Sequence, residues 1–358
     1  GARAAGSGGA APAAGGSGSP AAGSGVGGAA GGAAGGSGSG AGMSGGSAGA
    51  APSGSCPAPS LDAKPFGCKF AFGTNDPGGS LAGISELGFV SKWVGYELDK
   101  SGGLPRCDGC SWLTMNVAST PLIPVYYAYF IGFFGKANGL PDGNENPNGP
   151  NLTTDAAQLI RDHREQLIGV YANYAKQTAA VWKDKPLIWL LEGDFVQYTA
   201  ESQKNRLNLT ELGALSRDIT CAIKSNMPNA LVAVNQSTWN SDQVTKDFWT
   251  ALKDSNYDLV WTTGVPNNMG FFEKGTNSGS YNKDTATYKF VHEFTGRKIF
   301  VDTSFGLSGT SDSWSGASPA DLNSRIADGV IAANVTMPSS NYVATVKALV
   351  PMLTPTCK

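Results

Sequence analysis

The chain has 358 residues, of which 15% are charged, and a formal net charge of −2. This near-neutral balance argues against nucleic acid or an anionic membrane surface as the main partner, because both attract clustered Lys and Arg. No apolar run reaches the roughly 18 residues of a membrane-spanning helix, and the glycines show no period of three, which excludes collagen.

Residues 1–55 differ in composition from the rest of the chain. All but six are Gly, Ala or Ser, and the exceptions are Arg3, Pro12, Pro20, Val26, Met43 and Pro52. Because the segment has too few large apolar side chains to form a hydrophobic core, we expect it to be a disordered linker. A flexible coil of this length spans about 40 Å on average, enough to tether a domain near a surface. Residues 56–358 have the length of one large domain.

From Lys69 onward, short apolar runs alternate with longer amphipathic ones. The predicted strands are Lys69–Gly73, Phe89–Tyr96, Ile123–Phe130, Leu187–Leu191, Leu231–Asn235, Leu259–Thr263, Ile299–Asp302 and Val330–Val335. The predicted helices are Thr154–Val181, Thr210–Lys224, Asp242–Ser255, Asp284–Thr295, Pro319–Asp328 and Ser340–Leu349. Several strands are continuous apolar runs, as in parallel sheets covered on both faces. The alternation predicts an α/β fold, a distorted (β/α)8-type barrel.

Two connections depart from a regular barrel. Residues 78–87 are too few for an ordinary crossover helix, so the first units of the barrel should be irregular. Residues 135–153 are rich in Gly, Asn and Pro and are longer than a routine turn, so we expect a loop of the active site there.

The chain has six cysteines: Cys56, Cys68, Cys107, Cys110, Cys221 and Cys357. An even number predicts an oxidising compartment and up to three disulfides. For the C-x-x-C at Cys107 we expect a small disulfide-closed loop rather than half a zinc site or a redox pair, since no second C-x-x-C occurs. Among the other four, we expect Cys56 with Cys68 and Cys221 with Cys357, although spacing leaves the pairing open.

Carboxylates follow two of the predicted strands, at the end where such barrels carry their chemistry. Glu192 and Asp194 come directly after Leu187–Leu191 and leave on the same side if the strand continues. They suit a proton donor and a residue that orients it; a helix cap or an ion pair is the structural alternative. Asp302 ends another strand before a Gly/Ser-rich loop, which suits a catalytic acid or an Asp that closes its own turn.

Aromatic and amide side chains are frequent near the same strand ends. Rings that stack on sugar faces, together with amides and carboxylates that bind hydroxyl groups, suit a carbohydrate ligand. Each aromatic taken alone also fits the core. The predicted substrate-binding residues are Tyr127, Tyr129, Asn235, Trp239, Trp261 and Trp314. Nucleotide-binding glycine motifs are absent, and we expect neither a metal site nor a cofactor.

Two short motifs resemble family 6 glycoside hydrolases, the cellobiohydrolases II and related bacterial endoglucanases. Leu190–Asp194 reads LLEGD where the family has I-L-E-P-D, and Ile299–Ser304 resembles the first half of F-[IV]-[IV]-D-T-[SG]-R-N-G. The resemblance implies a distorted barrel that hydrolyses β-1,4-glucan with inversion, with Asp194 as the catalytic acid, Glu192 as its structural companion and Asp302 near the sugar. The family's assisting aspartate and its D-A-G-H segment have no counterpart in this chain.

We therefore predict a secreted or cell-surface glycoside hydrolase that cleaves a β-linked polysaccharide such as β-glucan or cellulose. Asp194 would protonate the glycosidic oxygen while Asp302 assists the attacking water, which inverts the anomeric carbon. One alternative is a retaining enzyme with Glu192 as acid/base and Asp302 as nucleophile. Another is a glycan-binding surface protein without catalysis. We expect the protein to be a monomer that the linker of residues 1–55 tethers to a surface. The polysaccharide is the only partner that we expect.

Overall fold

The computed structural model describes residues 56–60, 64–103, 107–143, 145–183, 185–193, 195–237, 240, 242–263, 287–303, 314–336 and 338–357. Of Asp242 and Thr263 it describes the backbone only. The predicted linker of residues 1–55 lies outside these ranges, as do the predicted site residues Asp194 and Trp239.

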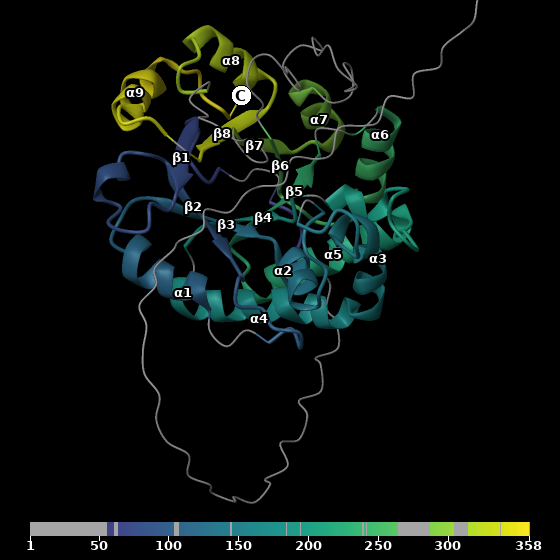
Figure 1. Ribbon diagram of the computed structural model, residues 1–358. Coiled ribbons are helices and arrows are strands. Elements are labelled where there is room, and N and C mark those ends of the chain that lie inside the picture. The colour runs from purple at the N-terminus through teal and green to yellow at the C-terminus, as the bar shows by residue number, and fades with distance from the viewer. Residues whose placement is uncertain are drawn as a thin grey trace, which may run out of the picture.

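Parallel strands close into a barrel in which each strand pairs with its neighbours in the sequence and β8 pairs with β1 (Figure 1). The strands are β1 (Ala71–Asn75), β2 (Phe89–Val94), β3 (Ile123–Ala128), β4 (Leu187–Leu191), β5 (Ala230–Gln236), β6 (Leu259–Thr263), β7 (Lys298–Asp302) and β8 (Val330–Val335). The predicted (β/α)8-type barrel is confirmed. The sequence predicted β4, β6 and β8 with the bounds that the structure has.

Helices surround the barrel in Figure 1. They are α1 (Asp108–Trp112), α2 (Phe130–Ala137), α3 (Leu152–Asp162), α4 (Arg164–Trp182), α5 (Leu209–Asn226), α6 (Asp242–Ala251), α7 (Tyr288–Thr295), α8 (Pro319–Ala327) and α9 (Tyr342–Leu349). The single helix predicted over Thr154–Val181 is two helices, because His163 leaves the helical conformation with φ −124°. Residues 78–87 contain only the short 3-10 turn Ala82–Ile84, in agreement with their length. The predicted loop at 135–153 begins later than expected, since α2 extends to Ala137.

The core has two layers, one inside the barrel and one between the strands and the helices. The inner layer includes Phe89, Tyr127, Leu190, Trp261 and Phe300. The ring of Phe89 lies 4.9 Å from that of Phe300 across the interior. Gly73 makes room for it, because a Cβ at that position would lie 2.2 Å from the Phe89 ring. The outer layer is larger and holds the apolar faces of the helices.

Three disulfides join Cys56 to Cys221, Cys68 to Cys357 and Cys107 to Cys110. The closed Cys107–Cys110 loop is confirmed. The predicted pairs Cys56–Cys68 and Cys221–Cys357 are wrong, because neighbours in sequence are not the neighbours in space. Cys68 precedes β1 and bonds to the end of the chain, whereas Cys56 reaches the last turns of α5.

The segment after Cys56 is fixed to the end of the barrel at which the strands begin. Lys224 of α5 forms a buried ion pair with Asp258, which precedes β6, at 2.7 Å. The segment covers this pair: Ser60 N donates to Asp258 Oδ1, and Lys224 Nζ donates to the carbonyl oxygen of Ala58. This arrangement leaves the opposite end of the barrel, where the strands finish, to the candidate site.

Candidate active site

A carboxylate lies at the centre of the end where the strands finish. Asp302, the last residue of β7, is 3% exposed. Tyr127 of β3 donates its phenol hydrogen to Asp302 Oδ2, and Asn334 of β8 donates to the same oxygen at 3.3 Å. Thr336, just after β8, donates to Oδ1 at 3.3 Å. Both oxygens of the carboxylate therefore accept hydrogen bonds: Oδ2 from β3 across the barrel and from the neighbouring β8, and Oδ1 from the residue after β8.

Asn334 connects this carboxylate to the first two strands. Its Nδ2 atom lies 3.0 Å from both Asn75 Oδ1 and the Tyr127 hydroxyl. Ser91 of β2 donates to Asn75 Oδ1 at 2.7 Å and to Asn334 Oδ1 at 3.2 Å. The strand register explains the cluster, because Asp302 stands opposite Asn334 and Asn75 opposite Ser91. Ser91 and Asn334 were not among the residues predicted from the sequence; their signal is a polar side chain at an inward-facing position of an otherwise apolar strand.

Two tryptophans hold the Tyr127 ring. Trp93 of β2 stacks on it with a centroid distance of 5.0 Å and an interplanar angle of 13°. Trp261 of β6 meets it edge-on at 5.8 Å and donates its Nε1 hydrogen to the Leu191 carbonyl at 2.7 Å. Burial raises the pKa of Tyr127 well above its ordinary value, and the nearby Asp302 carboxylate adds to this effect. Tyr127 therefore remains a neutral hydrogen-bond donor at physiological pH.

Tyr129 and Asn235 lie at the same end of the barrel. The half-buried ring of Tyr129 contacts Trp93 edge-on at 6.1 Å, and its hydroxyl donates to Asp142 Oδ1 at 3.2 Å. Asn235 of β5 is 2% exposed and accepts a hydrogen bond from Ser237 Oγ at 3.2 Å. The structure thus gathers four predicted binding residues, Tyr127, Tyr129, Asn235 and Trp261, at the end that holds Asp302.

Trp314 does not belong to this group. Its ring is 1% exposed and packs in the outer layer, where the guanidinium carbon of Arg325 lies 4.1 Å from the ring centroid. Phe70, which precedes β1, stacks on the Trp314 ring with a centroid distance of 6.5 Å and an interplanar angle of 9°. These are the contacts of the core role that the sequence left as the alternative for each aromatic.

Glu192 caps a helix. The side chain of Tyr129, the residue before α2, forms no cap hydrogen bond, and Glu192 Oε1 accepts from the Ile131 backbone N–H at 3.0 Å instead. The same oxygen accepts a hydrogen bond from the Tyr171 hydroxyl on α4. Burial raises the pKa of Glu192 to about 8, against the lowering effect of these hydrogen bonds. Its backbone φ of 24° is rare for a residue other than glycine, so the contact is kept despite backbone strain.

The contacts of Glu192 are those of the helix-cap alternative. Its hydrogen bonds join the end of β4 to α2 and α4, not to the network around Asp302. Within the described residues, no group of three or more His, Cys, Asp or Glu could hold a metal ion. In the same part of the chain, no helix combines the length and the apolar character that crossing a membrane requires.

No family model and no curated protein sequence matches this chain. Among solved structures, it is similar to the glycoside hydrolase family 26 β-mannanase BoMan26A from Bacteroides ovatus, with 12% identity, a TM-score of 0.54 and coverage of 83% of this chain and 93% of that one. The family 26 endo-β-1,4-mannanase from Cellulomonas fimi gives 10% identity, a TM-score of 0.50 and coverages of 80% and 72%.

The catalytic domain of β-amylase from Paenibacillus polymyxa is similar to the same degree, with 10% identity, a TM-score of 0.50 and coverages of 80% and 99%. At such identities the likeness shows the shared barrel fold alone. These structures give no specific support to family 6, which two motifs of the sequence resemble.

Proposed function

We propose that this protein is a glycoside hydrolase that cleaves a β-linked polysaccharide, with Asp302 as its central carboxylate. The arrangement around Asp302 carries the proposal: a buried carboxylate at the barrel mouth accepts three side-chain hydrogen bonds and lies beside stacked aromatic rings. A carboxylate supplied with donors suits a general base or a nucleophile rather than a proton donor. Amides, hydroxyls and aromatic rings around it suit a sugar.

Glycoside hydrolysis needs a second carboxyl group, and we assign the proton donor to Asp194, which follows β4 in the chain. Asp194 would protonate the glycosidic oxygen as the bond to the anomeric carbon breaks. A water molecule would attack that carbon from the opposite face and lose its proton to Asp302. This sequence of events inverts the anomeric configuration, and it requires carboxyl groups roughly 6.5–9.5 Å apart.

Two observations outside the network bear on the substrate and the setting. Two of the similar structures are β-mannanases and one is a β-amylase, so β-mannan belongs beside β-glucan among the candidate substrates. The three disulfides favour an oxidising compartment. We therefore propose an extracellular enzyme acting on β-glucan or β-mannan.

The deciding experiment measures reducing sugar released from cellulose, soluble β-glucan, β-mannan, xylan and chitin. The full chain is compared with Asp302→Asn, Asp194→Ala and Asp162→Asn, the last being an exposed control on α3. We expect release from at least one β-linked polymer, a loss of about 10²–10⁴-fold in either site variant, and no change in the control. Binding to the polymers without any release would contradict the hydrolase and favour a glycan-binding protein.

The anomer of the fresh product, observed by NMR, separates the two mechanisms. Inversion supports the pair Asp194 and Asp302. Retention would instead make Asp302 a nucleophile, and activity lost in Glu192→Gln would then assign the acid/base to Glu192. The raised pKa of Glu192 would suit that role, but its hydrogen bonds to α2 and α4 favour the structural one.

A further inference from the structure

A continuous series of aromatic rings leads from Asp302 to the surface. Trp93, which stacks on Tyr127, contacts Tyr129 at 6.1 Å between ring centroids. Tyr129 contacts Phe133 of α2 at 5.6 Å, and Phe133 contacts Tyr96 at 4.5 Å. We call these four residues, Trp93, Tyr129, Phe133 and Tyr96, the aromatic row.

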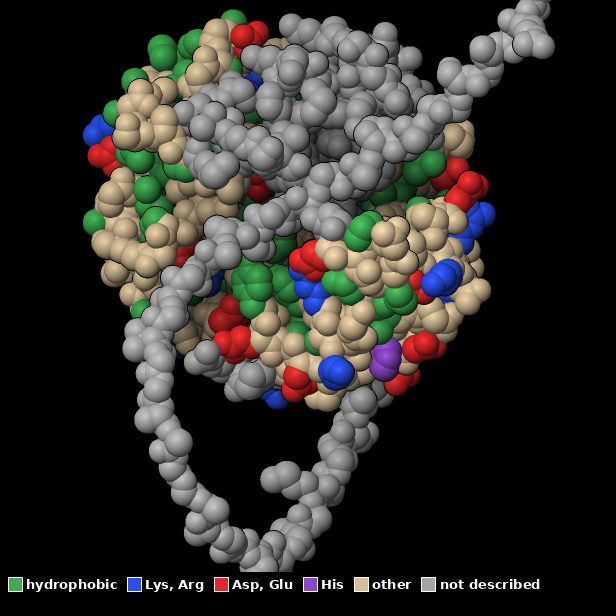
Figure 2. All heavy atoms as spheres, viewed as in Figure 1, with side chains coloured by type: hydrophobic (Ala, Val, Ile, Leu, Met, Phe, Trp, Pro, Cys, Tyr) green, Lys and Arg blue, Asp and Glu red, His purple; other side chains and the backbone are tan. Residues whose placement is uncertain are grey.

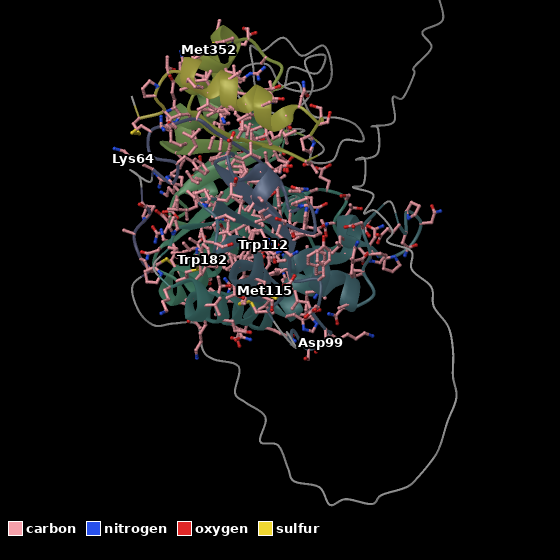
Figure 3. All side chains as sticks on the ribbon, turned by 90° about the vertical axis from the view of Figure 1, so that its left-hand side faces the viewer. Lys64, Asp99, Trp112, Met115, Trp182 and Met352 are labelled. Atoms are coloured by element: carbon pink, nitrogen blue, oxygen red, sulfur yellow. A yellow bond between two sulfur atoms is a disulfide. The ribbon has the colours of Figure 1, made fainter. Side chains whose placement is uncertain are left out.

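Exposure increases along the aromatic row. Tyr127 is 2% exposed, the next three rings are half-buried, and Tyr96 is 59% exposed. The other large hydrophobic side chains that the structure shows as exposed are in outer helical segments: Met115, Val181, Val244, Phe294 and Met352. Figure 3 shows two of these, Met115 and Met352, at well-separated places on the molecule. Among these described residues, only Tyr96 continues through ring contacts to the candidate active site.

Charged side chains lie along the same route. Lys136 of α2 pairs with Asp142 at 2.9 Å and with Glu145 at 3.1 Å, and Asp142 also accepts the hydroxyl of Tyr129. Figure 2 shows hydrophobic side chains gathered near α2 and the end of β3, with acidic and basic side chains next to them. Rings beside carboxylate and ammonium groups suit a ligand with apolar ring faces and hydroxyl edges, which a sugar has and an apolar peptide lacks.

The exposed end of the aromatic row is held in place by its own loop. Gly95, before Tyr96, has φ 93°, and a Cβ there would lie 2.3 Å from the Phe130 ring. Its N–H donates to Asp108 Oδ1, which also accepts the Tyr174 hydroxyl at 2.6 Å. Asp108 stands inside the Cys107–Cys110 loop. The disulfide thus helps to fix the position of Tyr96, so a ligand would meet a preorganised surface.

We infer that the aromatic row is a set of sugar-binding subsites, so that the substrate is a polysaccharide chain that occupies several subsites at once. The inference rests on the proposed function, because it takes Asp302 as the point of cleavage. A chain bound along the row would extend from the carboxylate over Trp93 and Tyr129 and leave the protein at Tyr96. Three successive rings separate Tyr127 from Tyr96, so we expect a disaccharide at Asp302 to make no contact with Tyr96.

The test uses Tyr96→Ala and Phe133→Ala in the full chain, with Tyr96→Phe as the conservative variant. Phe294→Ala, on α7 and 45% exposed, is the matched control for an exposed aromatic outside the row. Binding is measured by retardation in gels that contain carboxymethyl-cellulose or galactomannan. The rate of hydrolysis of the same polymers is compared with the rates for the disaccharides cellobiose and mannobiose and for the corresponding tetrasaccharides.

We expect Tyr96→Ala and Phe133→Ala to raise KM for the polymer about tenfold, the size of one aromatic contact, with kcat within about twofold. Both variants should turn over the disaccharides as fast as the unchanged protein does. Tyr96→Phe and Phe294→Ala should have the same KM and kcat for the polymer as the unchanged protein. Equal retardation and equal KM in Tyr96→Ala, Phe133→Ala and Phe294→Ala would overturn the inference, as would a lack of retardation of the unchanged protein in both gels.

The same variants in the Asp302→Asn background separate this inference from the proposed function. If Asp302→Asn is retarded and the addition of Tyr96→Ala abolishes the retardation, the subsites stand whether or not sugar is released. If the protein releases sugar but Tyr96→Ala changes neither KM nor retardation, the subsites fail and the hydrolase stands.

Discussion

The phenol of Tyr127 on β3 donates a hydrogen bond to the carboxylate of Asp302 on β7, although the two residues are 175 positions apart in the chain. Barrel closure brings β3 and β7 around one mouth, and Trp93 and Trp261 hold the Tyr127 ring from two sides. The bond fixes the orientation of the carboxylate that we place at the centre of the reaction. Its removal should therefore change activity more than it changes stability.

We expect Tyr127→Phe to lower kcat about 10- to 100-fold, because a hydrogen bond to a charged group contributes about 1.5–3 kcal/mol. The ring and its stacking on Trp93 remain, so KM should change little. Tyr342→Phe is the control, since Tyr342 donates to the Gly73 carbonyl in a buried bond of the outer layer. Steady-state kinetics on the best polymer should show full activity in the control. Equal losses in the two variants would contradict a role for Tyr127 at Asp302.

Stability should fall as the pH rises towards the pKa of Glu192. Burial raises this pKa from the ordinary value of 4.5 to about 8 in the folded state, so the folded protein binds the proton more tightly than the unfolded chain. The resulting stabilisation is complete below pH 4.5 and is lost as the pH rises through about 8. Over that window the free energy of unfolding should fall by roughly 1.4 kcal/mol per pH unit at most.

Glu192→Gln should remove this dependence, because the amide oxygen can still accept from Ile131 N–H and has no proton to lose in this range. Urea unfolding at pH 5, 6.5 and 8 for both proteins measures the difference. Parallel curves with the same pH slope would show that Glu192 titrates as it does in the unfolded chain.

The Cys56–Cys221 disulfide should stabilise the domain without affecting the site. It closes a loop with a sequence separation of 165, so Cys56→Ser with Cys221→Ser should lower the free energy of unfolding by about 2–4 kcal/mol. Activity at 25 °C should be unchanged, since the disulfide lies at the end of the barrel where the strands begin. Thermal unfolding followed by circular dichroism checks the first point, and an assay of the folded variant checks the second.

The Lys224–Asp258 ion pair should show strong coupling. Both side chains are almost fully buried, so Lys224→Met alone should destabilise the domain by about 3–5 kcal/mol, because it leaves a buried carboxylate without its cation. The double variant Lys224→Met, Asp258→Asn should lose much less free energy of unfolding than the two single variants lose in sum. Denaturant unfolding of the four proteins of this cycle gives the coupling energy; additive effects would mean that the pair does not act as a unit.

The barrel itself could be predicted from the sequence. The alternation of short apolar runs with amphipathic ones encodes which faces are covered, and this pattern is local. It located β4 at Leu187–Leu191 and put Asp302 at the end of β7. The same local reasoning placed carboxylates and aromatic residues at the strand ends. The structure brings four of these residues together at one end of the barrel: Asp302, Tyr127, Tyr129 and Trp261.

Contacts between segments that are far apart in the chain could not be predicted from the sequence. It could not show that Asn334 and Ser91 complete the network of Asp302, that Glu192 turns towards α2, or that Cys56 bonds to Cys221. These depend on strand register, on the backbone conformation after β4 and on the closure of β8 onto β1. A periodic pattern determines which side of an element is buried, whereas only the packed tertiary structure determines which buried groups meet.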